Sequence, residues 1–547
     1  MELIEQARQW REQDLDPDTR AELDQLIVQA SADNEEIAGK AVDELAVAFA
    51  GPLEFGTAGL RGRIGPGPAR MNRIVVTQAA AGFARWLEAN GHGGGKVIVG
   101  YDARHKSADF ARDTAEIFRG AGFEVLLTDE PTPTPVVAFG IQHYGCVAGI
   151  VVTASHNPPQ DNGYKVYLGD GSQIVPPTDA EIAAQIADVA AGEWPALPRE
   201  DGWTVVGDDL REAYVARVAT LVPEAGDVRW VHTAMHGVGS RVVRMAAERA
   251  GFQPANEVTE QAEPNPDFPT VSFPNPEEPG AIDLALQLAS ETDADVVIAN
   301  DPDADRCAVA TKIAGTWRML TGDELGSLLG DDAIRRGVPG VLANSVVSST
   351  LLRTMAEASS RDHRTTLTGF KWIGRVPELG YGYEEAIGYC IDPEAVPDKD
   401  GIATAMTVLR LVGELKADGL TIADRLDEIM RTYGLHATRQ LSVRVADLSI
   451  IADAMARLRA NPPASLLGEP VTVTDLTDGL GDLPGTDAVL IEGEYVRVVC
   501  RPSGTEPKLK CYLQVRFEPG NELPHSEAND KLQRLRSEIA RVLGVEG

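Results

Sequence analysis

The stretch KVIVGYDAR, residues 96–104, decides the fold class of this chain. Its apolar run is typical of a buried strand, and the polar residues at its end indicate a loop. A helix-like segment, SADFARDTAEIFRGAG (107–122), follows it, and FEVLLTD (123–129) and VAGIVVTAS (147–155) are two further strand candidates. Strands that alternate with helices at this spacing predict a mostly parallel sheet, with functional sites at the carboxyl ends of its strands.

The alternation recurs twice more along the chain. One block begins near residue 203 and contains WVHTAM (230–235) and DVVIAN (295–300), and another contains GVLANSVVSST (340–350) and EAIGYCI (385–391). The tail differs, because QLSVRVADLS (440–449), VRVVCRPSGTEPKLKCYLQVRF (496–517) and a final helix over 525–543 indicate a smaller α+β domain.

We therefore predict an α/β protein of three consecutive α/β domains with mixed, mostly parallel sheets and a C-terminal α+β domain. The expected parts are an N-terminal extension of two amphipathic helices (1–50), domain I (51–203), domain II (204–318), domain III (319–435) and domain IV (436–547). Residues 255–280 are too rich in proline for regular structure and are expected to form a long loop.

Composition excludes several classes of protein. The chain has 547 residues and a net charge of −33, which argues against nucleic acid and anionic lipid as partners. The sequence contains no run of 18 apolar residues, so it predicts no membrane span. The charged N-terminal segment lacks the apolar core of a signal peptide. Five dispersed cysteines indicate reduced thiols, so a cytoplasmic protein is expected: Cys146, Cys307, Cys390, Cys500 and Cys511.

The segment ANDPDADR (299–306) places three carboxylates in a tight loop after a predicted buried strand. Asp301, Asp303 and Asp305 alternate along that loop and can converge on one point. Carboxylate oxygens are hard ligands that suit Mg²⁺ or Ca²⁺, although the glycine and distal glutamate of an EF-hand are missing. The alternative is an acidic turn on a very acidic protein.

Two other segments can bind anions. In CRPSGTEPKLK (500–510), the N–H and O–H groups of a turn with Arg501 and Lys508 beside it can face a phosphate, unless it is only a solvated hairpin. The glycine-rich LEFGTAGLRGRIGPGPARMN (53–72) lacks the spacing of a nucleotide P-loop, but the backbone at Arg61 can approach an anion.

A serine follows directly on a strand-like run in VVTASHNPPQDNGYKVY (151–167). Ser155 is not in the G-x-S-x-G setting of a hydrolase nucleophile, so it would need a base or an unusual state to react. If it carried a phosphoryl group, His156 and Lys165, the latter in a predicted glycine turn, could move protons on an accepting sugar hydroxyl. For Lys165 such a role requires a lowered pKa.

Taken together, TASHNP with NGYK, then DPDADR, EEAIG and RPSGTEP resemble the α-D-phosphohexomutase superfamily, which includes the phosphoglucomutase/phosphomannomutase family. The resemblance covers roughly residues 50–520. It implies four domains around a central cleft and the transfer of a phosphoryl group between C1 and C6 of a hexose. The implied route uses Mg²⁺, a phosphoserine and glucose 1,6-bisphosphate as intermediate and activator.

Position by position, the resemblance implies that Ser155 is the phosphoserine and binds the metal with Asp301, Asp303 and Asp305. It implies acid–base and transfer roles for His156 and Lys165 and support of the transferring group by Arg61 and Arg306. Glu384 in GYEEAIGY would bind the sugar hydroxyls. The remaining implied substrate contacts are Thr368, Gly369, Lys371, Lys399, Arg501, Ser503, Gly504, Thr505 and Lys508.

Two departures from the commonest family pattern affect the expected substrate. Ala386 replaces a serine in the sugar loop, and Pro302 replaces a glycine in the metal loop. Both resemble a subgroup of phosphoglucomutases and phosphopentomutases. We expect a phosphoglucomutase of unspecified oligomeric state, monomer or dimer, with phosphomannomutase or phosphopentomutase as the alternative.

Two other classes compete with a mutase. A metal-dependent phosphatase with an aspartyl nucleophile in DPDADR is disfavoured, because Arg306 stands where that class has threonine or valine. A non-catalytic sugar-phosphate sensor is disfavoured because the serine and all three aspartates are present.

Overall fold

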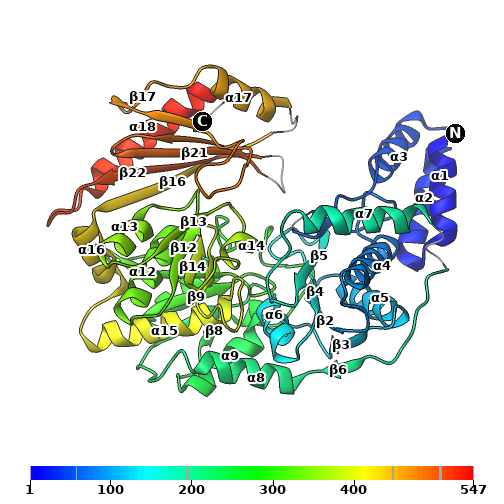
Figure 1. Cartoon of the computed structure of the whole chain (residues 1–547), viewed down its shortest axis with the longest axis horizontal. Helices are drawn as coiled ribbons and strands as arrows, with labels where there is room; N and C mark the ends of the chain where they lie inside the picture. Colours follow the sequence, from blue (N-terminus) through cyan, green and yellow to red (C-terminus); the bar gives the residue numbers. More distant parts are fainter. Residues whose placement is uncertain are drawn as a thin grey trace. The chain divides into compact units, whose positions relative to one another are not determined.

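The computed structural model describes residues 2–56, 58–192, 196–445, 447, 449–503 and 508–545. The chain divides into two compact units, which Figure 1 draws in the colours of the sequence. The first unit comprises Met1–Ala310 and Asp392–Gly413, and the second comprises Thr311–Ile391 and Glu414–Gly547. Three α/β sheets and a C-terminal β-rich sheet confirm the predicted fold class.

The N-terminal extension has three helices where the sequence predicted two: α1 (Glu2–Gln13), α2 (Pro17–Ala30) and α3 (Glu35–Ala48). The side chain of Asp16 caps α2, whose first residue is Pro17, and the side chain of Asn34 caps α3. These are ordinary helix-start signals that divide the amphipathic pattern twice. The three helices share a small core around Leu23 and Leu45.

The first sheet carries the serine segment. Its strand order is β1-β5-β4-β2-β3-β6, in which β4, β2, β3 and β6 run parallel and β5 pairs antiparallel with both β4 and β1. The strands are β1 (Leu60–Arg63), β2 (Lys96–Tyr101), β3 (Glu124–Thr128), β4 (Ala148–Val152), β5 (Asp161–Leu168) and β6 (Thr204–Val206).

Helices cover both faces of this sheet. On one face, Val97 and Val99 share a core with α4 (Arg73–Ala89), α5 (Ser107–Gly120) and α7 (Thr178–Ala191). Ile98 points to the other face, where α6 (Thr134–His143) packs (Figure 1). Because successive side chains of a strand point to opposite faces, a continuous apolar run such as KVIV fits a strand buried on both sides.

The second sheet positions the aspartate loop. It contains β7 (Trp230–Thr233), β8 (Asn256–Glu257), β9 (Val296–Asn300), β10 (Cys307–Ile313) and β11 (Thr316–Met319), in the order β11-β10-β9-β7-β8. The chain passes from the first unit to the second within β10. Its helices are α8 (Asp208–Ala219), α9 (Gly239–Ala250), α10 (Thr259–Ala262) and α11 (Asp283–Glu291). The predicted loop 255–280 is therefore irregular except for β8 and α10.

The second unit contains two larger sheets and the two-stranded sheet β17-β18. The first has the order β13-β12-β14-β15 and the second, antiparallel throughout, the order β16-β22-β21-β20-β19. Its strands are β11 (Thr316–Met319), β12 (Val341–Ser345), β13 (His363–Thr366), β14 (Leu379–Glu384), β15 (Gly388–Cys390), β16 (Leu435–Arg444), β17 (Ser465–Leu466), β18 (Glu469–Pro470), β19 (Thr472–Asp475), β20 (Val489–Glu492), β21 (Val496–Pro502) and β22 (Lys508–Phe517). Its helices are α12 (Gly322–Arg335), α13 (Leu351–Ala358), α14 (Phe370–Ile373), α16 (Ile422–Tyr433), α17 (Ser449–Ala460) and α18 (His525–Leu543), and α15 (Gly401–Ala417) belongs partly to each unit.

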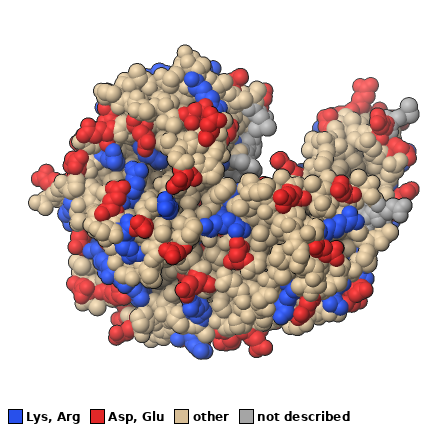
Figure 2. Space-filling model, viewed as in Figure 1, with Lys and Arg blue, Asp and Glu red and all other residues tan. Residues whose placement is uncertain are grey.

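All five cysteines are buried and free, as expected for reduced thiols. Among the described residues, no helix is both long and apolar enough to cross a membrane. Figure 2 shows acidic and basic side chains interspersed over the face in view, so the net charge of −33 does not form one acidic patch there.

We expect acid to destabilise the second unit through His436. Burial, with Arg516 and Arg353 nearby, lowers the pKa of this imidazole to about 3 from an ordinary value of 6.5. The unfolded chain therefore takes up this proton below pH 6.5 and the folded chain only near pH 3, so stability falls as the pH falls between these values. Linkage gives a loss of about 3 kcal/mol by pH 4.

The substitution His436→Gln removes this titration and can keep a hydrogen bond to Thr350, which His436 contacts at 3.0 Å. Hydrogen exchange of β16 and β22, corrected for intrinsic rates, should lose less protection between pH 7 and pH 4.5 in this variant than in the wild type. His92→Gln, at an exposed position in the first unit, is the control. Equal losses in wild type and H436Q would contradict the assignment.

Candidate active site

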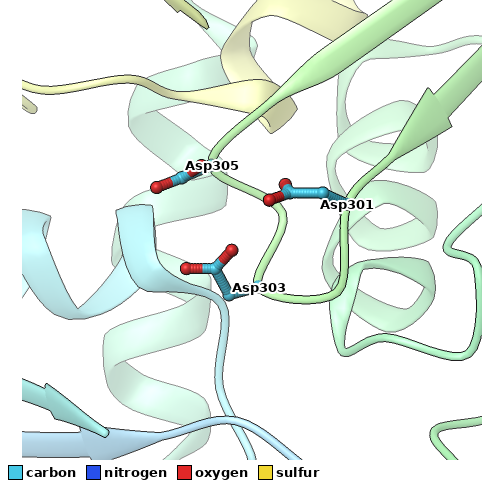
Figure 3. A group of neighbouring side chains, drawn as sticks. All are labelled: Asp301, Asp303 and Asp305. Carbon is cyan, nitrogen blue, oxygen red and sulfur yellow. The ribbon is translucent and has the colours of Figure 1, made fainter. Parts of the chain in front are cut away.

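Three aspartates converge on the loop between β9 and β10. Asp301, Asp303 and Asp305 are all buried, and their ligand oxygens lie within 4.8 Å of one another. Figure 3 shows the three side chains arising from this single loop, with carboxylates directed at a common space. The spacing of DPDADR therefore has the predicted result.

The donor set fits a hard divalent cation. Asp303 Oδ1 and Asp305 Oδ1 are buried and accept no hydrogen bond from the residues that the structure describes. A buried carboxylate oxygen without a partner is costly, and Mg²⁺ accepts such oxygens as ligands. The three aspartates could hold Mg²⁺ here.

Lys165 provides the local counter-charge. Its Nζ donates to Asp303 Oδ2 and Asp305 Oδ2, both at 2.7 Å. Lys165 lies within β5, directly across from Val151 of β4, and not in the glycine turn that the sequence suggested. The segment pairs with strands on both sides, which stabilises an extended conformation despite Gly163.

The charge state of Lys165 differs from that required of a lysine base. Burial alone would lower the pKa of its ammonium, but Asp303 and Asp305 raise the pKa above its ordinary value. In turn the lysine holds the pKa of Asp303 below its usual range, against the effect of burial. Burial and its two acidic neighbours raise the pKa of Asp301 well above the usual range.

Ser155 contacts the aspartate loop directly. Its hydroxyl donates to Asp301 Oδ2 at 2.6 Å, and the residue is 2% exposed. Its backbone is left-handed, with φ 51°, which is an uncommon conformation for a residue other than glycine. The serine therefore lies at the aspartate cluster.

His156 Nδ1 lies 3.1 Å from Ser155 Oγ. Because the single hydroxyl proton of Ser155 goes to Asp301, this contact requires Nδ1–H as the donor, which leaves Nε2 unprotonated in the neutral ring. Burial, with Arg306 and Arg61 nearby, lowers the pKa of His156 well below 6.5. The imidazole is thus a neutral potential base beside the serine.

Three further cations surround the cluster. Arg61, on β1, donates to Asn157 Oδ1 at 3.2 Å, and Arg306 Nε lies 3.7 Å from Asp305 Oδ1. Lys399 Nζ lies 3.4 Å from Asp305 Oδ2. Gly401 permits this approach, because a Cβ atom there would lie 2.3 Å from the carbonyl oxygen of Arg306.

The other candidate residues belong to the second unit. Thr368 and Gly369 precede α14, Lys371 lies within it, and Glu384 is the buried last residue of β14. Ser503 N donates to the carbonyl oxygen of Lys508 at 2.8 Å. Arg501 lies in β21, and Lys508 begins β22. Gly504 and Thr505 lie outside the described residues.

Some residues at these sites gave no local signal in the sequence. Thr134 Oγ1 donates to Asp303 Oδ2 at 2.6 Å, although it comes from TPTPVV at the start of α6. Glu385, beside the proposed sugar ligand, accepts hydrogen bonds from Ser345 at 3.1 Å and from Ser348 at 3.2 Å. Arg104 donates a hydrogen bond to the main-chain carbonyl oxygen of Ser155, although the sequence YDAR indicated only the end of a strand.

Comparison with known proteins identifies the family. Models described as phosphoglucomutase/phosphomannomutase alpha/beta/alpha domains I, II and III match residues 52–193, 212–314 and 321–433. The crystal structure of a putative phosphomannomutase from Thermus thermophilus covers 90% of this chain and 99% of its own, with a TM-score of 0.71 and 26% identity.

Named relatives extend over most of the chain. A Haemophilus influenzae protein named "Probable phosphomannomutase" is 47% identical over 82% of this chain and 93% of its own. Phosphopentomutase of Mus musculus is 35% identical over 99% of this chain and 94% of its own. Phosphoglucomutase of Staphylococcus aureus is 31% identical over 86% of this chain and 90% of its own.

The chain belongs to the phosphoglucomutase/phosphomannomutase family of the α-D-phosphohexomutase superfamily, as the motifs indicated. It is a phosphomutase, an isomerase-class phosphotransferase that acts on a sugar phosphate. This family membership disfavours the phosphatase and sensor alternatives.

We expect removal of a carboxylate to weaken cation binding. Asp303→Asn and Asp305→Asn should each reduce Mn²⁺ affinity by about tenfold or more, because each removes an anionic oxygen from a buried ligand set. Titration followed by the electron paramagnetic resonance signal of free Mn²⁺ measures this affinity. Asp293→Asn, at an exposed side chain shortly before β9, is the matched control. Unchanged affinity in both cluster variants would contradict the metal site.

Proposed function

We propose that the chain interconverts glucose 1-phosphate and glucose 6-phosphate through a phosphorylated Ser155 and bound glucose 1,6-bisphosphate. The observation that carries this proposal is the 2.6 Å hydrogen bond from Ser155 Oγ to Asp301, within a buried aspartate cluster. A phosphoserine carries nearly two negative charges, so it needs such a cation site and basic neighbours.

In the proposed transfer, the bond between phosphorus and Ser155 Oγ breaks as a bond forms between phosphorus and a sugar hydroxyl oxygen. His156 would take the hydroxyl proton at Nε2, and its Nδ1–H, within hydrogen-bond reach of Ser155 Oγ, would supply the proton that the leaving Oγ needs. Mg²⁺, when bound, would neutralise charge on the transferring group. Arg61 and Arg306 would stabilise the same group electrostatically.

We assign Lys165 to charge balance and positioning, because its raised pKa keeps it protonated between Asp303 and Asp305. We further propose that Glu384 binds sugar hydroxyls together with Thr368, Gly369, Lys371 and Lys399. The loop containing Arg501, Ser503, Gly504, Thr505 and Lys508 would bind the phosphate that is not transferred. We also propose that the chain has four domains, over 51–203, 204–318, 319–435 and 436–547, and that it is cytoplasmic.

The alternative is a phosphomannomutase or a phosphopentomutase with the same reaction type. The names of the Haemophilus influenzae and mouse relatives favour these substrates, whereas the name of the Staphylococcus aureus relative favours glucose. Ala386 lacks the hydroxyl of the serine in the commonest sugar loop, so one polar group of that pattern is missing.

We expect Ser155 to carry the phosphoryl group. Incubation with glucose 1,6-bisphosphate should add one phosphate, which peptide mapping by mass spectrometry places on Ser155, and excess glucose 1-phosphate should remove it. Ser155→Ala should lose roughly 1,000-fold or more in kcat, as expected on removal of a nucleophile. Exposed Ser290→Ala is the control. Full turnover by S155A without an adduct would refute the proposal.

We expect glucose 1-phosphate to give the highest kcat/KM among glucose, mannose and ribose 1-phosphates in coupled assays. S155A should lose activity toward all three substrates to the same extent, since each reaction would use the phosphoserine. A much higher kcat/KM for ribose or mannose 1-phosphate would replace the glucose assignment with the corresponding alternative and leave the reaction type unchanged.

A further inference from the structure

Arg104 lies behind the serine loop, in the turn that follows β2. Its guanidinium is almost completely buried, with 1% of the side chain exposed. It donates hydrogen bonds to four main-chain carbonyl oxygens between β4 and the start of β5: Ser155 at 2.6 Å, Asn157 at 2.5 Å, Pro158 at 2.8 Å and Asp161 at 3.2 Å. One side chain thus binds the whole loop that carries the proposed phosphoserine.

This loop needs an external partner to keep its shape. Ser155 has a positive φ and lies beyond the β4–β5 ladder, whose last paired residue in β4 is Val151. Within the loop, Thr153 Oγ1 accepts from Ser155 N at 2.8 Å, and Asn157 Nδ2 donates to Asp161 Oδ2 at 2.9 Å. These bonds, with the main-chain bonds from Asn157 N to Ala154 O and from Asp161 N to Pro158 O, act over a few residues, whereas Arg104 joins the loop from Ser155 to Asp161. Buried carbonyl groups that lose their donors are costly.

Arg104 is itself fixed from two sides. Its Nε lies 3.4 Å from Asp102 Oδ2, and Asp102 Oδ1 accepts from Arg104 N at 3.0 Å. The guanidinium carbon lies 5.0 Å from the centre of the Phe268 ring, which covers it. Phe268 is a buried residue of the proline-rich segment, so this segment shields the arginine from water.

We propose that Arg104 is a positioning residue that holds Ser155 Oγ at the aspartate cluster. The inference rests on the proposed function, because it assumes that Ser155 carries the phosphoryl group. Arg104 acts through main-chain carbonyls and not through substrate. Its loss should therefore lower kcat and the rate of Ser155 phosphorylation and change KM little.

The planar fork of arginine suits this task. A guanidinium offers five N–H donors at fixed angles, and here two of its nitrogens serve four carbonyls. A lysine ammonium has three donors on a single nitrogen and cannot match this geometry. Arg104→Lys should therefore recover only part of the function, although it preserves the charge.

The experiment compares Arg104→Ala, Arg104→Lys and Ser155→Ala in the full chain. Measurements are kcat and KM for glucose 1-phosphate, the melting temperature, and the rate of phosphorylation by glucose 1,6-bisphosphate from intact mass. Arg119→Ala is the matched control, since this partly buried arginine of α5 donates to a main-chain carbonyl, that of Phe123, away from Ser155. Guanidinium chloride at millimolar concentration is added to each variant to restore the missing group.

We expect R104A to lose about 100-fold in kcat and in phosphorylation rate, with KM changed by less than about threefold. Added guanidinium should restore part of kcat in R104A alone, and R104K should lie between R104A and the wild type. R119A should keep its kcat even where its melting temperature falls as much as that of R104A.

Three results would overturn the inference: wild-type kcat in R104A, a loss that follows the melting temperature without guanidinium rescue, or a rise in KM equal to the fall in kcat. The last would make Arg104 a substrate contact. S155A separates this failure from failure of the proposed function. If S155A is inactive and R104A normal, only the positioning role fails, whereas active S155A refutes the phosphoserine itself.

Discussion

The burial of three carboxylates in one loop is the constraint on which the rest of the first unit depends. Asp301, Asp303 and Asp305 could not stay ionised together in an apolar interior, because like charges at this range oppose each other strongly. Lys165 bridges two of them, and Ser155 donates to the third. The carboxylates lie in a loop of the second sheet, and their partners belong to the first sheet. The contacts that offset the buried charge therefore also bring the proposed nucleophile to the candidate metal site.

Features governed by local sequence could be predicted. Apolar runs and the helices between them define the three α/β sheets, and alternate aspartates after the strand that ends at Asn300 converge as expected. The third N-terminal helix was missed because Asp16-Pro17 and Asn34 divide a continuous amphipathic pattern, and these caps are short signals. The local sequence predicts a turn at Lys165 because of the glycine beside it, but β5 pairs on both sides and is extended there.

Partners from distant sequence could not be predicted in this way. The role of Thr134 at Asp303 and that of Arg104 at the serine loop depend on contacts 169 and 51 residues away, respectively. Neither residue type indicates such a contact by itself. The pKa of Lys165 illustrates the same limit, since burial and neighbouring carboxylates act in opposite directions and only the geometry decides which effect is larger. The motifs identify the chemical groups, and the fold sets their protonation.

The acidity of the whole chain and the chemistry of the site make opposite demands. A net charge of −33 repels a sugar phosphate at long range, and salt weakens this repulsion beyond roughly 10 Å. Within the first unit, however, four basic side chains, those of Arg61, Lys165, Arg306 and Lys399, offset the four carboxylates of Asp301, Asp303, Asp305 and Asp398. A bound divalent cation would make the net charge of this cluster positive. The site can therefore hold a doubly charged phosphoryl group because its short-range field is set by these few buried residues, independently of the surface.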